Sequence, residues 1–208
     1  MSLGAGETTL MRLTTAYAML VNGGKRIAPT LLDRIQDRHG RTVFSHDRRV
    51  CKGCRQKAWS GELPPRVPDT RKQVTDAGSA YQVVAMLKGV VDRGTGRRIA
   101  KIGKPLAGKT GTTNQERDTW FIGFTSNLVV GVYVGYDNPK RLGKYETGSK
   151  TALPIFKEFI KKAVNNYEAR PFKIAKGIKM MVIDAETGKK ADFGSRFGVE
   201  RSAWCPRL

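Results

Sequence analysis

The tetrapeptide Lys109-Thr110-Gly111-Thr112 combines an ammonium group, two hydroxyls and one position without a side chain. Side chains alternate along an extended strand, so Lys109 and Gly111 would face one way and the two threonines the other. The missing Cβ of Gly111 would let a ligand backbone approach closely. On an edge strand, an extended peptide could then add to this segment through main-chain hydrogen bonds. The segment therefore predicts a surface that holds a carboxylate and a carbonyl together.

Each group in this segment has an expected role in such a site. The hydroxyls of Thr110 and Thr112 can bond a terminal carboxylate, and the Lys109 ammonium supplies a compensating field. The backbone N–H of Thr112 could point at a developing oxyanion, and losing one such donor typically costs about 2.7–4 kcal/mol. Taken alone, Lys-Thr-Gly also fits a turn that ends a strand. The surrounding elements must decide between the two interpretations.

Three helices and two hairpins are expected around the motif. Apolar periodicity predicts helices over 8–22, 76–92 and 153–165, with Thr8 and Asp76 as caps of the first two. Residues 105–113 carry the motif, and the runs 119–125 and 128–136 read as a hairpin. Another hairpin is expected over 27–44, an exposed loop over 45–73 and a strand over 178–183. The sequence therefore predicts a fold that contains both helices and strands, with antiparallel pairing at the two hairpins.

Bulk properties narrow the function classes. The chain has 208 residues, long enough for one domain with an appendage, and we expect residues 1–3 to be an added start outside the fold. No apolar run approaches the roughly 20 residues that cross a bilayer. A formal charge of +20 suggests polyanionic surroundings and leaves a basic nucleic-acid-binding module as an alternative. The cations are scattered in pairs without a basic helix or finger spacing, so we expect no nucleic-acid partner.

Two of the three cysteines, Cys51 and Cys54, form a single C-x-x-C in a polar, proline-rich stretch. A structural zinc site needs four ligands, and a thioredoxin-like pair would start a helix after a strand, so both interpretations are weak. A local disulfide in an oxidising compartment and two inert thiols remain as alternatives. We expect neither a metal nor a cofactor, and the state of Cys205 stays open.

The segments around the motif resemble the transpeptidase domain of class A penicillin-binding proteins. The strongest are Gly108-Lys109-Thr110-Gly111-Thr112-Thr113-Asn114, Asp118-Thr119-Trp120-Phe121-Ile122-Gly123 and Gly131-Val132-Tyr133-Val134-Gly135-Tyr136-Asp137. Further matching segments are Thr15-Ala16-Tyr17-Ala18, Asn22-Gly23-Gly24, Val90-Val91-Asp92-Arg93-Gly94-Thr95-Gly96, Glu146-Thr147-Gly148 and Pro154-Ile155-Phe156. The resemblance spans about residues 4–165 in register, so it does not depend on one tripeptide.

This resemblance implies acyl transfer in peptidoglycan cross-linking. A serine would attack the D-Ala-D-Ala amide of a stem peptide, and β-lactams would acylate the same serine. Lys109 would serve proton traffic and carboxylate binding, Thr110 and Thr112 would hold the carboxylate, the Thr112 N–H would form half the oxyanion hole, and Gly111 would leave room. A cysteine pair would suit a periplasmic member.

One departure from the family pattern is serious. No serine in the sequence has Lys three residues on or Asn two residues on, so the S-x-x-K and S-x-N motifs are absent. The resemblance thus implies an incomplete domain: 4–168 as the C-terminal part of the transpeptidase, 169–208 as an extension, and nucleophile, glycosyltransferase domain and membrane anchor further upstream. We expect the chain alone to be inactive.

The same resemblance implies an α/β fold class of the α+β type, in which an antiparallel sheet is flanked by helices. It places the motif strand at one edge of this sheet and the family's first strands beyond 128–136. Without them this run would be an unpaired apolar edge, so we expect either oligomers or a need for the missing N-terminal part. A β-lactamase or carboxypeptidase relative is the nearest rival, and Asp118-x-Trp120-Phe121 with the Gly-Thr-Gly after the second helix favours the transpeptidase. A non-catalytic domain that binds peptidoglycan or a partner through the same strand is a further alternative.

Overall fold

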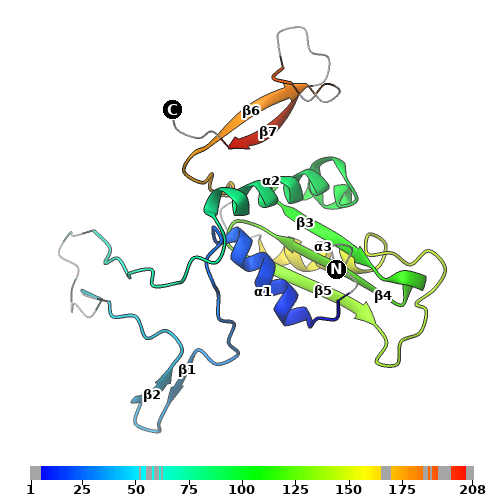
Figure 1. Cartoon of the computed structure of the whole chain (residues 1–208). Helices are drawn as coiled ribbons and strands as arrows, with labels where there is room; N and C mark the ends of the chain where they lie inside the picture. Colours follow the sequence, from blue (N-terminus) through cyan, green and yellow to red (C-terminus); the bar gives the residue numbers. More distant parts are fainter. Residues whose placement is uncertain are drawn as a thin grey trace.

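The computed structural model describes residues 6–51, 53–54, 58, 61, 63–164, 170–184, 187, 189–191 and 198–204. Its centre is an antiparallel sheet of order β3-β4-β5, formed by Ala107–Thr112, Asp118–Phe124 and Val129–Gly135. Three α-helices accompany it: α1 (Leu10–Val21), α2 (Ala77–Arg93) and α3 (Ala152–Ala163). In Figure 1, α1 lies in front of the sheet, α3 behind it, and α2 above β3. This arrangement confirms the predicted fold class.

Local sequence signals explain where the helices begin and end. The Asp76 carboxylate accepts a hydrogen bond from the Ser79 amide at 2.7 Å, which confirms the predicted cap of α2. This bond holds the pKa of Asp76 below its ordinary value. The cap predicted at Thr8 is wrong, because Thr9 is the residue whose hydroxyl accepts from the Arg12 amide, at 3.2 Å. The N-cap of α1 therefore lies one residue later in the chain than the sequence indicated.

Two apolar clusters fill the faces of the sheet. Behind it, Phe156 of α3 packs edge-on against Phe121 of β4 with ring centroids 4.8 Å apart, and both side chains are fully buried. In front, Phe124 meets Tyr17 of α1 and the buried Val84 of α2. Fully burying one such apolar side chain contributes about 1.5–3 kcal/mol. These clusters fix β4 as the rigid support of the motif strand.

Residues 25–51 and 63–73 form an arm that leaves the body between α1 and α2 (Figure 1). It carries the short hairpin β1 (Arg34–Gln36) and β2 (Thr42–Ser45). The predicted hairpin is confirmed, but its first strand is far shorter than the run from residue 27. Pro29 lacks an N–H, and the Thr30 hydroxyl makes a local turn by bonding the Leu32 amide and carbonyl, so pairing begins only at Arg34.

The two ends of the arm are held together at the body. The Arg26 amide donates to the Lys72 carbonyl at 2.8 Å, and the Val74 amide donates to the Gly24 carbonyl at 2.9 Å. Lys25 also pairs with Asp69 at 2.5 Å. Because these bonds join the two ends of the arm, the arm is a long loop that leaves the packing of α1 and α2 undisturbed.

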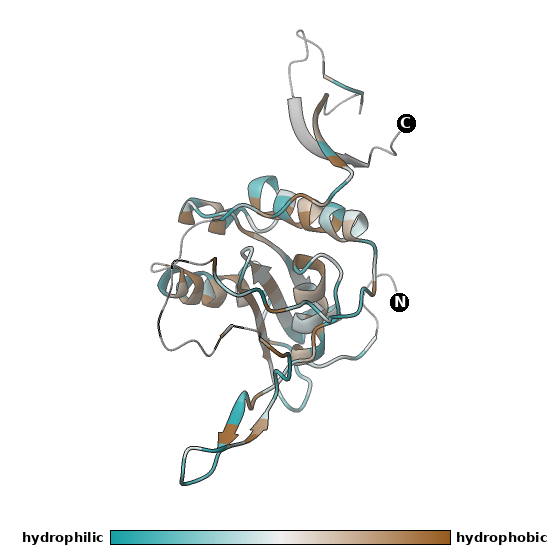
Figure 2. Ribbon diagram, turned by 90° about the vertical axis from the view of Figure 1, so that its left-hand side faces the viewer, coloured by the Kyte–Doolittle hydropathy of each residue, from teal (hydrophilic) through white to brown (hydrophobic). Residues whose placement is uncertain are grey.

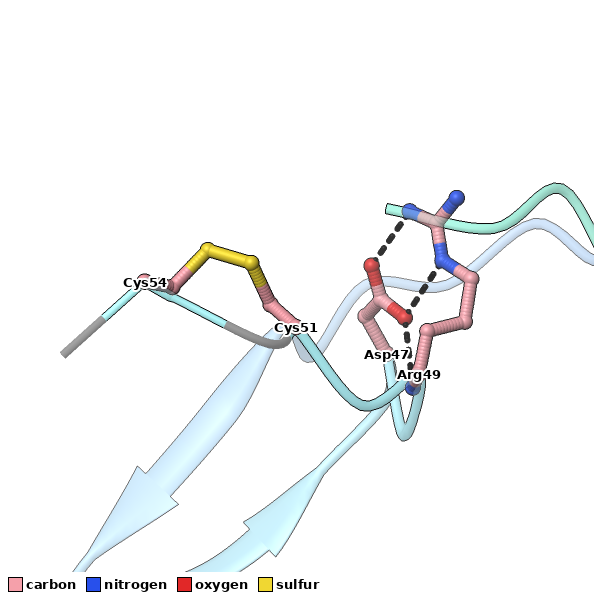
Figure 3. The surroundings of a disulfide bond; sticks show 4 residues. All are labelled: Asp47, Arg49, Cys51 and Cys54. Carbon is pink, nitrogen blue, oxygen red and sulfur yellow. Dashed lines mark hydrogen bonds and ion pairs between the residues drawn. A yellow bond between two sulfur atoms is a disulfide. The ribbon is translucent and has the colours of Figure 1, made fainter. Parts of the chain in front are cut away.

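The structure joins Cys51 and Cys54 of the arm in a disulfide, with their Cα atoms 5.5 Å apart (Figure 3). The neighbouring Arg49 donates to both oxygens of the Asp47 carboxylate, at 2.8 and 2.5 Å. This paired guanidinium holds the pKa of Asp47 well below its usual range. The bond closes a loop of only four residues, so it constrains the arm locally. Cys205 lies outside the described residues.

A second hairpin follows the domain near the C-terminal end. Its strand β6 (Ile178–Asp184) confirms the predicted strand, and it pairs antiparallel with β7 (Gly198–Trp204), which the sequence did not indicate. Figure 2 shows β6 standing beyond α2, away from the central sheet. The Tyr81 hydroxyl of α2 contacts the Met180 sulfur at 3.7 Å. No helix among the described residues is both long and apolar enough to span a bilayer.

Candidate functional site

The motif lies on β3, which is an edge strand of the sheet. Within the described residues β3 pairs only with β4, and this confirms the expectation of an edge. The Thr113 amide donates to the Asp118 carbonyl at 3.1 Å, so bonded pairs fall at every second residue from that point, including Gly111 with Trp120. The main-chain groups of Thr110 and Thr112 consequently point away from β4. They are available to an incoming strand.

Lys109 extends its side chain along this open edge. It is exposed, and its Nζ donates to the Thr110 carbonyl at 3.0 Å and lies 3.5 Å from the Thr110 hydroxyl. The first residues of β3, Ala107 and Gly108, are buried, whereas the strand becomes accessible from Lys109 onward. The ammonium therefore lies beside the outward main-chain groups, where it can attract an anion.

Thr110 is held by a residue that sequence reasoning did not single out. Its hydroxyl lies 3.1 Å from the hydroxyl of Thr95, in the turn after α2. Gly94 and Gly96 on either side both donate their amides to the Val90 carbonyl, and a Cβ at either position would come within 3.2 Å of that carbonyl oxygen. The glycines let the chain fold back onto the helix end, and this places Thr95 against the motif.

Thr112 is held from a different direction. Its hydroxyl oxygen accepts a hydrogen bond from the Gly148 amide at 3.0 Å. Gly148 lies against the sheet itself, because a Cβ there would be 2.5 Å from the Gly111 carbonyl oxygen and 2.6 Å from that of Trp120. Since the Thr112 oxygen accepts this bond, its own hydrogen is left to donate elsewhere.

The turn from β3 to β4 is closed by short-range bonds. The Thr113 hydroxyl accepts from the Asp118 amide at 3.0 Å, and the Asp118 carboxylate accepts from the Trp120 indole at 3.0 Å. The Trp120 ring in turn packs on Tyr133 of β5 with centroids 4.7 Å apart. These contacts explain why Asp118-x-Trp120 accompanies the motif: they fix the strand next to the motif.

The described part of the chain contains no cluster of three His, Cys, Asp or Glu residues that could hold a metal ion. The assembled groups are an ammonium, two hydroxyls and outward backbone donors. Such a set can bind an anionic, extended peptide end, and it includes no paired nucleophile and base.

Comparison with known proteins assigns this arrangement to a family. Residues 1–161 match the family described as the penicillin binding protein transpeptidase domain. The chain belongs to this family. Penicillin-binding protein 1A of Rickettsia prowazekii is 45% identical over 199 residues, which cover 94% of this chain and 25% of that protein. Penicillin-binding protein 1A of Neisseria flavescens is 35% identical over 179 residues, covering 86% of the chain and 20% of the relative.

A solved structure agrees with this assignment to the penicillin-binding transpeptidases. The crystal structure of penicillin-binding protein 1A from Haemophilus influenzae matches with a TM-score of 0.79 and 26% identity, covering 100% of this chain and 34% of that one. The chain thus spans about a fifth to a third of the length of these relatives. The resemblance inferred from the motif and its neighbours is confirmed at the level of the family.

Proposed function

We propose that this chain supplies the carboxylate-binding side of a serine D,D-transpeptidase that cross-links peptidoglycan. The observation that carries the proposal is the open edge of β3, where Lys109 and the outward main-chain groups of Thr110 and Thr112 lie together. An extended stem peptide would add to this edge and present its terminal carboxylate to the two hydroxyls. β-Lactams, which also carry a carboxylate, would bind in the same place.

The reaction would proceed as two acyl transfers. A serine oxygen forms a bond to the carbonyl carbon of the penultimate D-Ala, the C–N bond breaks, and terminal D-Ala leaves with the serine proton. An amine of a neighbouring peptide then attacks the ester carbon, the C–O bond breaks, and the proton lost by the amine returns to the serine. In both steps the carbonyl oxygen becomes negative, and the Thr112 N–H would donate to it. Losing such a donor typically costs about 2.7–4 kcal/mol.

The nucleophile of this reaction would come from outside these 208 residues, because no serine here has the S-x-x-K spacing. The chain alone would bind substrate without cleaving it. We propose residues 4–168 as the C-terminal part of the domain and 169–208 as an extension, working on the periplasmic side of the membrane. A disulfide between Cys51 and Cys54 fits an oxidising compartment.

The test is acylation by a labelled penicillin, measured by intact mass. We expect no adduct on this chain, and a stoichiometric adduct on a longer version in which the family's upstream serine segment precedes it. In that longer protein, Lys109→Ala should lower the acylation rate about 10- to 100-fold, as expected for a lost charged hydrogen bond. Lys162→Ala, on the exposed side of α3, removes the same charge and should leave the rate unchanged. An adduct on this chain, or equal effects of the two substitutions, would contradict the proposal.

A further inference from the structure

The loop between β5 and α3, residues 136–151, crosses the end of the motif strand, and we name it the strap. The described non-glycine residues with positive φ all lie in the strap or in the turn after β3: Gln115 at 63°, Glu116 at 55° and Tyr145 at 65°. Such a backbone conformation is unfavourable for a residue with a side chain, and it persists only where its surroundings hold it in place. The strain therefore marks the junction between turn and strap.

Glu116 is the residue that joins the two segments. Its carboxylate accepts from the Arg141 guanidinium at 2.9 and 2.7 Å and from the Tyr145 amide at 3.0 Å. Its carbonyl accepts from the Leu142 amide at 3.0 Å. The Glu116 side chain is only 18% exposed, whereas that of Arg141 is 57% exposed, so the carboxylate is the more enclosed partner of the pair. A single side chain thus fixes both ends of the 141–145 segment of the strap.

The held segment leads directly to the motif. Three residues after Tyr145 the strap places Gly148 against Gly111 and the Trp120 carbonyl, where its amide donates to the Thr112 hydroxyl oxygen. Glu116 itself lies four residues after Thr112 along the chain. The bonds of Glu116 to the strap and the bond from Gly148 to Thr112 therefore link the turn, the strap and the end of β3.

We propose that Glu116 is a positioning residue for the Thr112 hydroxyl, and that the ligand it serves is the terminal carboxylate of an extended peptide. The inference rests on the proposed function of the β3 edge. By holding the strap, Glu116 keeps the Gly148 N–H on one lone pair of the Thr112 oxygen. The hydroxyl hydrogen then points outward, ready to donate to an anion. Without Glu116 the strap relaxes from the edge, and the hydroxyl can rotate to other partners.

The experiment is an NMR titration of the 208-residue chain with N-acetyl-D-Ala-D-Ala and, separately, with its C-terminal amide. We expect wild type to prefer the acid, and Glu116→Ala to weaken acid binding about tenfold, or ~1.4 kcal/mol, while amide binding stays the same. Glu116→Gln keeps the acceptor for the Tyr145 amide and should lose less. Glu158→Gln, on the exposed face of α3, is the matched control, because it removes a charge of the same sign at a position that does not contact the strap.

The Gly148 amide provides an independent readout. Its chemical shift and hydrogen exchange should change in Glu116→Ala and stay unchanged in Glu158→Gln. If Glu116→Ala impaired folding in general, the binding of the acid and of the amide would weaken alike. The acid-to-amide ratio of Glu116→Gln, which preserves the shape of the side chain, would then decide whether Glu116 positions the Thr112 hydroxyl. An unchanged acid-to-amide ratio in both Glu116 variants, or an unchanged Gly148 amide, would overturn the role of Glu116 alone. A wild-type chain that does not distinguish acid from amide would overturn the proposed function and this inference with it.

Discussion

Substituting Gly148 by alanine tests how the strap is seated on the motif strand. A Cβ at this position would lie 2.5 Å from the Gly111 carbonyl oxygen, 2.6 Å from the Trp120 carbonyl oxygen and 3.1 Å from the Gly111 nitrogen. All three are main-chain atoms of a paired ladder, so no side chain can rotate away. The strap must therefore move off the sheet by at least about half an ångström, and the bond from the Gly148 amide to Thr112 is lost with it.

The cost follows from these two effects. Overpacking a fitted contact costs about 1–3 kcal/mol, and losing a hydrogen bond adds about 1 kcal/mol, so Gly148→Ala should destabilise the chain by ~2–4 kcal/mol. For a chain of this size, where 1 kcal/mol shifts the Tm by about 2–4 °C, the Tm should fall by about 4–16 °C in a thermal unfolding experiment followed by circular dichroism. The NMR resonances of Gly111 and Thr112 should shift as well.

A control separates this steric effect from the general cost of replacing glycine. Gly103, at φ 72°, has no neighbour near its would-be Cβ. Gly103→Ala should lose about 1–2 kcal/mol through its backbone conformation and leave the resonances of Gly111 and Thr112 unchanged. If Gly148→Ala keeps the wild-type Tm and the wild-type resonances at the motif, the proposed seating of the strap is wrong.

Other predictions concern the core, the arm, helix α2 and the free edge of β5. Phe156→Ala should cost about 3–5 kcal/mol in urea unfolding, whereas Phe159→Ala, half-exposed on the same helix, should cost far less. Reducing and alkylating Cys51 and Cys54 should change the intact mass and leave the main thermal transition in place. The lowered pKa of Asp76 stabilises the fold at pH values above the pKa of an unfolded aspartate, and this contribution is lost as pH falls through the folded-state pKa. In Asp76→Asn the free energy of unfolding, measured at a series of acidic pH values, should therefore depend less on pH than in wild type. Light scattering should show oligomers of the isolated chain, and a monodisperse, folded monomer would contradict the role given to the β5 edge.

Local signals in the sequence were sufficient for much of the fold. The cap at Asp76 follows from the first turn of α2, and the apolar stripe of α2 follows from residues three and four apart. The β4–β5 hairpin follows from two β-rich runs joined by a short turn. The cap and the hairpin depend on residues close together in the chain. The edge position of Lys109 was expected from the resemblance. The predicted start of the first strand of the arm was wrong, because Pro29 and the turn at Thr30, rather than apolar content, decide where pairing starts.

The sequence did not reveal the residues that hold the motif in place and that lie far from it along the chain. Thr95 contacts Thr110 across 15 residues, Gly148 contacts Thr112 across 36, and Arg141 contacts Glu116 across 25. No spacing rule connects such pairs, because they meet only when the sheet, α2 and the strap pack together. The Gly-Thr-Gly after α2 was noted as part of the resemblance, and its glycines were the one available sign of a close backbone approach.

These distant contacts suggest how recognition and chemistry are divided in this transpeptidase family member. The groups that would bind the carboxylate are short side chains and main-chain atoms, each held by a different segment: Thr110 by the turn after α2, Thr112 by the strap, and the strand itself by β4. None of these supports depends on a serine nucleophile. Anion binding at the β3 edge should therefore persist in the isolated chain even where acylation does not, so the two properties can be measured apart. Peptide titration of this chain reports on the edge alone, and penicillin acylation of a longer version reports on the edge and the serine together.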